Sequence, residues 1–70
     1  MTARQAPREH INCAFRAINK SVQDLEDAEC DLRTDASKAI CKLERADRRI
    51  RQAASDVRAA LRVLRQEAKP

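Results

Sequence analysis

The sequence predicts an all-α fold, a helical hairpin of two long antiparallel helices that dimerises into a four-helix bundle. Strong helix formers dominate the chain, and glycine, tryptophan and tyrosine are absent. Apolar residues recur at alternating spacings of three and four, which is the periodicity of an amphipathic helix. A polar segment near the middle separates two such patterns, and the apolar face rotates between them. Together these observations define one small helical domain over residues 1–70.

The first helix is expected over about residues 7–32, after a frayed basic tail at residues 1–6. Pro7 suits the first position of a helix, where its missing N–H group costs nothing. The apolar stripe of this helix is interrupted once, by Glu29. Its members are Ile11, Phe15, Ile18, Val22, Leu25 and Leu32.

A turn is expected at about residues 33–35. Residues 31–37 read Asp-Leu-Arg-Thr-Asp-Ala-Ser, and Thr34 or Asp35 can cap the helix that follows. The alternative is a single unbroken helix over residues 8–68, about 90 Å long at 1.5 Å per residue. Charge favours the hairpin, because residues 21–47 carry a net charge of −4 while residues 1–20 carry +3 and residues 48–70 carry +5.

The second helix, over about residues 36–68, carries two stripes on different faces. In its apolar stripe Asp47 and Ala54 lie among large residues, and the stripe also contains Ile40, Leu43, Ile50, Val57, Leu61 and Leu64. Alanine recurs every seven residues beside this stripe, at Ala39, Ala46, Ala53 and Ala60. Such small side chains permit close approach of two helices.

Self-association is expected because only thirteen side chains are large and apolar, which makes a lone hairpin marginally stable. A folded hairpin is acidic at its turn and basic at its open end, so two copies complement each other in an antiparallel dimer. Within a hairpin, the acidic residues expected beside Lys38, Lys42 and Arg45 are Asp24, Asp27 and Asp31. The residues predicted to form the core or the dimer contact are Phe15, Ile18, Val22, Leu25, Leu43, Ile50, Val57, Leu61 and Leu64.

The basic stripe of the second helix is the strongest functional signal. The residues predicted to bind a partner are Arg48, Arg51, Arg58, Arg62 and Arg65. The non-functional interpretation is a solvated flank that pairs with the acidic turn of another copy or with Glu44, Asp47, Asp56 and Glu67. The leading hypothesis is docking on an acidic surface of another protein, because guanidinium groups pair with carboxylates in bidentate geometry. Nucleic acid is the rival partner, although the chain has a single aromatic residue for base stacking.

Catalysis, metal binding and cofactor binding are not expected. His10 is the only histidine, and a dyad with Cys13 is the weaker interpretation of that pair. The three cysteines lack metal-ligand spacing and are expected as reduced cytoplasmic thiols, with a reversible Cys30–Cys41 disulfide as the alternative. No segment is apolar enough for a membrane span or a secretory signal, and the absence of glycine excludes a phosphate-binding loop.

Around the turn the chain resembles the Rop/Rom family of plasmid copy-number proteins. Leu32, Asp35, Ile40 and Cys41 fall at spacings similar to those of that family's turn, and Ala14-Phe15 is similar to part of its first helix. The resemblance implies an antiparallel dimer of hairpins that binds paired RNA loops, with Phe15 and Asn19 as the contacts. This chain departs from the family by placing most of its basic residues on the second helix.

A looser similarity connects the chain with very short, Ala/Arg-rich helical proteins encoded by phages and mobile elements, some of which disable a host regulator. The sequence therefore predicts a small non-enzymatic regulator or inhibitor that acts by stoichiometric protein–protein binding. The alternatives are an RNA-binding regulator of the Rop type and a purely structural coiled coil.

Overall fold

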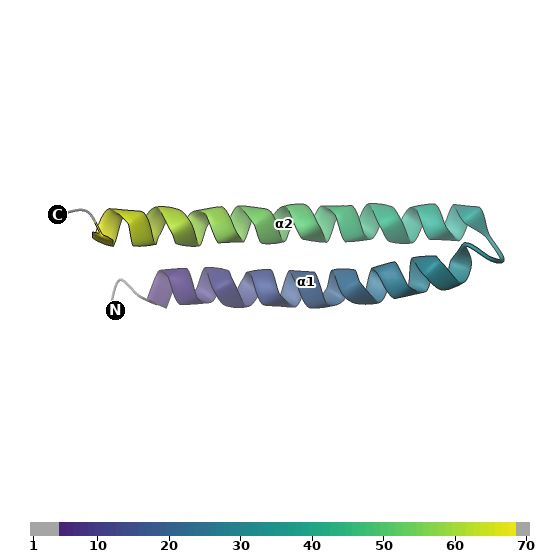
Figure 1. Ribbon diagram of the computed structural model, residues 1–70, viewed down its shortest axis with the longest axis horizontal. Coiled ribbons are helices and arrows are strands. Elements are labelled where there is room, and N and C mark those ends of the chain that lie inside the picture. The colour runs from purple at the N-terminus through teal and green to yellow at the C-terminus, as the bar shows by residue number, and fades with distance from the viewer. Residues whose placement is uncertain (1–4, 69–70) are drawn as a thin grey trace.

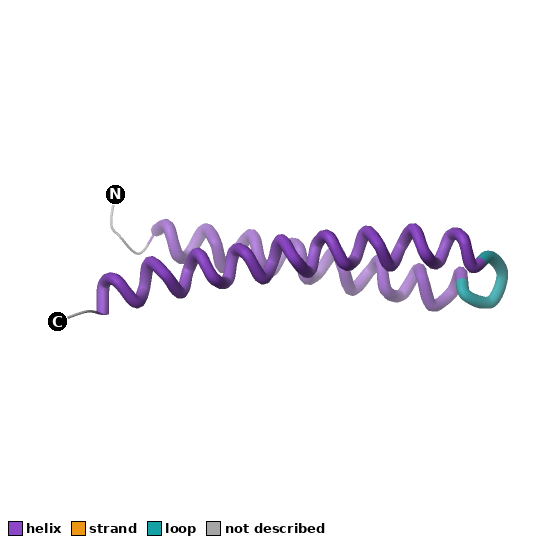
Figure 2. The backbone as a smooth tube through the Cα atoms, turned by 90° about the horizontal axis from the view of Figure 1, so that it is seen from above, coloured by secondary structure: helices purple, strands orange, loops and turns teal. Residues whose placement is uncertain are grey.

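The computed structural model describes residues 5–68 as two antiparallel helices joined by a tight turn (Figure 1). Helix α1 spans Gln5–Asp31 and helix α2 spans Ala36–Ala68. The molecule measures 56 × 16 × 12 Å, and in the perpendicular view the helices cross at a shallow angle (Figure 2). The predicted all-α hairpin is confirmed, and the single helix of about 90 Å is excluded.

Helix α1 begins earlier than the sequence predicts. The helix already includes Gln5, so Pro7 lies inside the first turn instead of opening it. The first four N–H groups of a helix have no partner within that helix, so proline is tolerated throughout this turn. The frayed tail predicted for residues 1–6 overlaps this turn, and its first four residues lie outside the described part of the chain.

The turn is closed without glycine. The N–H groups of Thr34 and Asp35 both donate to the carbonyl oxygen of Asp31, at 3.0 and 2.7 Å. The Oδ1 atom of Asp35 then accepts from the N–H of Ser37 at 3.0 Å and from that of Lys38 at 3.4 Å. Asp35 is therefore the cap of α2, one of the two residues predicted for that role.

Small residues at seven-residue intervals form the contact between the helices, here called the seam. Every seventh residue is buried, in the set Pro7, Ala14, Ser21 and Ala28 of α1 and the set Ala39, Ala46, Ala53 and Ala60 of α2. Because the helices run in opposite directions, numbering places Ala28 at the level of Ala39 and Ala14 at that of Ala53. Ser21 is accommodated because its hydroxyl donates to the carbonyl oxygen of Ile18 at 2.7 Å.

The large apolar side chains lie outside the seam, on one side of the hairpin, in a surface here called the apolar face. Each of them is 42–63% exposed, and no large side chain of the described residues is fully buried. The apolar face consists of Ile11, Phe15, Ile18, Val22, Leu25, Leu32, Ile40, Leu43, Ile50, Val57, Leu61 and Leu64. All nine residues predicted for the core or dimer contact belong to it, so none of them forms a core within one chain.

Enlarging a seam residue should destabilise the hairpin. Ala53 is 3% exposed, so Ala53→Leu forces the helices apart and should lower the free energy of unfolding by about 1–3 kcal/mol. Ser55→Leu adds a side chain of the same size at an exposed position two residues away and should change it by less than about 0.5 kcal/mol. Urea denaturation followed by circular dichroism measures both, and equal effects would contradict the seam.

The cap can be tested separately. Asp35→Ala removes the acceptor for two backbone N–H groups and should cost about 1 kcal/mol of stability, whereas Asp35→Asn retains an oxygen acceptor and should cost much less. Thermal unfolding of the two variants gives the comparison. A larger loss for asparagine than for alanine would rule out capping as the role of Asp35.

Candidate functional site

A row of charged residues runs beside the small residues of the seam and joins the helices by ion pairs. Arg49 Nη1 lies 2.6 Å from Asp24 Oδ2, and the Asp24 side chain is 5% exposed while that of Arg49 is 33% exposed. The same guanidinium donates to the carbonyl oxygen of Lys20 at 3.4 Å. Buried or partly buried charges need such partners, so this contact fixes the register of the two helices near their middle.

Two further contacts continue this row. Lys42 Nζ lies 3.5 Å from Asp27 Oδ2, as the sequence predicts for that acid. His10 Nδ1 lies 3.7 Å from Asp56 Oδ1, too far for a hydrogen bond. The bases predicted to lie beside the three acids were Lys38, Lys42 and Arg45, and none of them forms the ion pair of Asp24 within the described residues. Asp24 instead pairs with Arg49, a full turn farther along α2, because Arg49 lies on the seam side of its helix.

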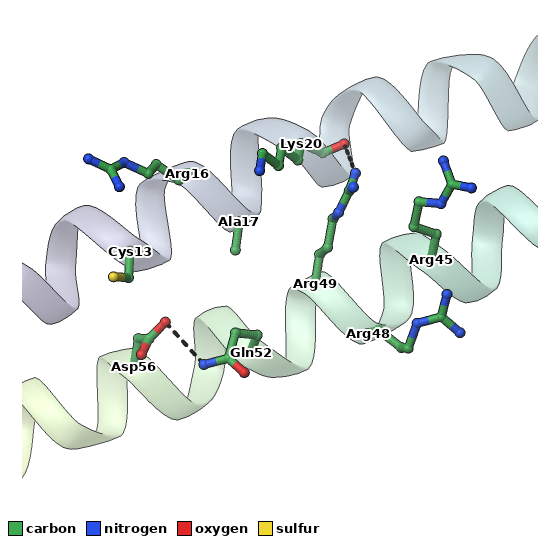
Figure 3. A pocket seen from close by; sticks show the side chains of 9 residues that line it. All are labelled: Cys13, Arg16, Ala17, Lys20, Arg45, Arg48, Arg49, Gln52 and Asp56. Carbon is green, nitrogen blue, oxygen red and sulfur yellow. Dashed lines mark hydrogen bonds between the residues drawn. The ribbon is translucent and has the colours of Figure 1, made fainter.

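A basic groove opens between the helices where this row is interrupted (Figure 3). Its volume is about 590 Å³, and Ala17 lies in it with Arg49 reaching across from α2 to the backbone of Lys20. The residues that line the basic groove are Cys13, Arg16, Ala17, Lys20, Arg45, Arg48, Arg49, Gln52 and Asp56. Ala17 occupies the place that Asp24 holds one seven-residue repeat later, so its short side chain leaves the groove open.

The groove is strongly positive. It contains five basic residues and one acid. Among the described residues only Arg49 of these five forms an ion pair, with Asp24 outside the lining, whereas Asp56 faces His10. Arg16, Lys20, Arg45 and Arg48 form none within the described chain. Four unneutralised bases around a hollow define a surface that attracts anionic groups.

Comparison with protein-family models, curated proteins and solved structures finds no match. The surfaces of the hairpin are therefore the basis on which its function is inferred.

The predicted arginine stripe is exposed along its whole length, and its members lie in three different surroundings. Arg48 lines the basic groove, and Arg51 pairs with Asp47 at 3.1 Å on the surface. The other three, Arg58, Arg62 and Arg65, surround a shallower depression of about 420 Å³ with Leu61 and Gln66. Of the four acids considered as internal partners of the stripe, only Asp47 contacts it within the described residues.

The groove residues on α1 were missed at the sequence level. Arg16 and Lys20 are four apart and flank Ala17, which is a detectable signal of a basic helix face with a gap. These two residues can be assigned to one site with Arg45 and Arg49 only when the register between the helices is known. The periodicity within one helix does not give that register.

The remaining candidate residues are scattered over the surface. Phe15 is 62% exposed and Asn19 is exposed, one turn apart on α1. The three cysteines are free and exposed, and Cys13 borders the basic groove. Within residues 5–68 there is no cluster of metal-binding side chains, and neither helix is long and apolar enough to cross a membrane.

The ion pair in the seam should contribute measurably to stability. Asp24→Ala leaves the partly buried Arg49 without its carboxylate and should lower the free energy of unfolding by about 1–3 kcal/mol. Glu26→Ala removes the same charge from an exposed position on the same helix and should change it by less than about 0.5 kcal/mol. If chemical denaturation gives equal losses for the two, the pair does not set the register.

Proposed function

We propose that this protein is a small non-enzymatic regulator that acts by stoichiometric binding as an antiparallel homodimer. Two hairpins pair through their apolar faces, and the exposed arginines of α2 dock on an acidic surface of another protein. The observation that carries the proposal is the apolar face, twelve large side chains that a single chain leaves at least 42% exposed. The protein's three cysteines, Cys13, Cys30 and Cys41, are free and exposed, which is consistent with action in the reducing cytoplasm.

The size of the apolar face supports a second copy as its occupant. Soluble monomers rarely expose contiguous apolar patches above a few hundred Å². The apolar face follows both helices along a hairpin 56 Å long and carries twelve large exposed side chains, so a second copy can cover it over many residues, as in stable interfaces. Another hairpin offers the same length and the same spacing of side chains.

The outer row of α1 supports the antiparallel orientation. Arg8, Phe15, Val22 and Glu29 follow one another at seven-residue intervals. Reversal about a point next to Ile18 places Arg8 opposite the Glu29 of a second copy and Phe15 opposite its Val22. The two charged ends of the row are thereby complementary, which a parallel pairing would not achieve.

The outer row of α2 can be reversed about the same level, although its ends are apolar and not charged. Reversal about a point next to Ile50 exchanges Ile40 with Leu61 and places Asp47 opposite Ala54. Ile18 and Ile50 lie at the same level of the hairpin by the numbering of the seam. One two-fold axis at that level therefore matches both helices at once.

The dimer can be tested by light scattering and small-angle X-ray scattering. The wild type should have a mass of about 16 kDa, twice 7.9 kDa, and Ile50→Asp should lower it by placing a charge within the apolar face. Wild-type protein that remains monomeric at the concentrations used for scattering would contradict the proposed pairing.

The orientation has its own test, a charge exchange in which the double variant keeps the composition of the chain constant. Arg8→Glu or Glu29→Arg alone creates two like-charge contacts per dimer and should raise the dimer Kd by about tenfold, whereas the double exchange should restore it. Analytical ultracentrifugation measures the three constants. If the double variant dimerises more weakly than either single variant, this orientation is excluded.

Partner docking is tested by charge reversal on the stripe. Arg58→Glu with Arg62→Glu should abolish partner capture. Because Arg58 borders the apolar face beside Ile50 and Val57, light scattering on the same variant checks that the dimer still forms. Lys38→Glu with Arg33→Glu is the control, since these bases lie near the turn. Pull-down with mass spectrometry identifies the partner, and capture that survives the stripe variant would show that the face is wrongly assigned.

The RNA-binding alternative makes a different prediction. Filter binding to structured RNA at two salt concentrations should show only weak association if the partner is a protein. Sub-micromolar affinity with a steep salt dependence would replace the protein partner by RNA.

A further inference from the structure

We propose that the basic groove is a second binding site, which receives the carboxylate side chains of an acidic helix from a partner protein. The proposal rests on the binding function inferred above, but it does not depend on Arg58, Arg62 and Arg65. The groove is defined by residues of both helices, whereas Arg58, Arg62 and Arg65 all lie on α2.

The chain itself shows how this part of the seam holds a carboxylate. Asp24 follows Ala17 by seven residues, which places both on the same line along α1. At Asp24 the carboxylate is 5% exposed and lies 2.6 Å from Arg49. At Ala17 the carboxylate is missing, while basic side chains of both helices line the groove. Arg49, which binds Asp24, also lines the groove and donates to the carbonyl oxygen of Lys20. A carboxylate supplied from outside would complete the row.

The spacing of the bases fits a helix that carries acids one turn apart. Arg16 and Lys20 are four residues apart on α1, so their Cα atoms are separated by about 6 Å along the axis. Arg45 and Arg49 repeat that separation on α2. Glutamates at positions i and i+4 of a third helix have the same rise, so each acid can meet a base on either wall of the groove.

The chemistry of the lining favours carboxylates over nucleic acid. The groove contains no aromatic residue on which a base could stack. Its arginines pair with planar carboxylates through two parallel hydrogen bonds. Asp56 lies among the lining residues and would repel a continuous phosphate backbone, whereas a protein helix can place a hydrogen-bond donor there.

The groove stays open in the proposed dimer. At 100° per residue, Arg16 and Lys20 lie on the side of α1 opposite Ile18 and Val22. Pairing of two apolar faces therefore leaves both grooves accessible on the outer surfaces of the bundle. A partner can occupy the groove without competing with the second copy.

The experiment uses fluorescence anisotropy with two labelled helical peptides, one carrying glutamates at i and i+4 and the other glutamines at the same positions. The glutamate peptide should bind the full-length chain at least about tenfold more tightly. Equal affinity for the two peptides would overturn the proposal. A structured RNA that displaces the labelled glutamate peptide at a lower concentration than the unlabelled glutamate peptide does would overturn the assigned ligand class.

A substitution at Ala17 fills the groove from within. Ala17→Glu supplies the missing carboxylate and should weaken peptide binding by more than about tenfold, while Ala17→Gln, which has the same shape without the charge, should weaken it less. Ala17 is only half-buried, so both variants are expected to fold, and circular dichroism verifies this. Undiminished binding by a folded Ala17→Glu variant would overturn the site.

The paired controls separate this site from Arg58, Arg62 and Arg65, the part of the arginine stripe that lies outside the groove. Arg16→Gln with Lys20→Gln should reduce peptide binding by about tenfold or more, and Arg58→Gln with Arg62→Gln should leave it unchanged. Loss of binding only in the second variant would assign the acidic ligand to the stripe and overturn the groove. Light scattering on the same samples reports the dimer independently, so failure of the groove and failure of the dimer are distinguishable.

Discussion

The structure depends on the close approach of two helices through side chains no larger than proline. Alanine, serine and proline repeat every seven residues along the seam, so the helices meet over most of their length. A seam of this kind buries little apolar area and leaves no room for leucine or isoleucine. The large side chains are therefore displaced to one face, where a single chain cannot cover them. The same feature that permits the hairpin thus leaves the apolar face exposed, which is the basis of the proposed dimer.

The charged side of the seam determines the register that the small residues leave weakly defined. Methyl groups at regular intervals fit at several offsets, whereas Asp24 and Arg49 meet at one. The neutral Ala17 breaks the charged row and leaves bases facing a hollow. Stability and the proposed recognition therefore involve the same row of positions. Where a carboxylate is present the row joins the helices, and where it is missing the row forms the basic groove.

Local signals in the sequence were sufficient for the helices and the turn. Asp35 caps α2 through the N–H groups of Ser37 and Lys38, two and three residues later, so the interaction is local in the sequence. The distribution of large and small residues was harder to predict, because periodicity identifies an amphipathic face without saying which row of it meets the other helix. The pairing of Asp24 with Arg49 and the basic groove depend on how α1 is offset against α2. Single-helix periodicity carries no information on that offset, so the α1 half of the groove was not foreseen.

The proposed dimer explains how weak contacts can give a specific binder. Each exposed arginine contributes little on its own, since a surface ion pair is worth about 0–1 kcal/mol. A two-fold dimer presents every basic surface twice, on a scaffold whose helices hold the bases at fixed spacing. A partner that also has two-fold symmetry would meet two grooves or two stripes at once, and the second contact would form at high effective concentration. Affinity for such a partner would then depend on the geometry of the whole bundle, so loss of the apolar contact would also weaken recognition by arginines that remain unchanged.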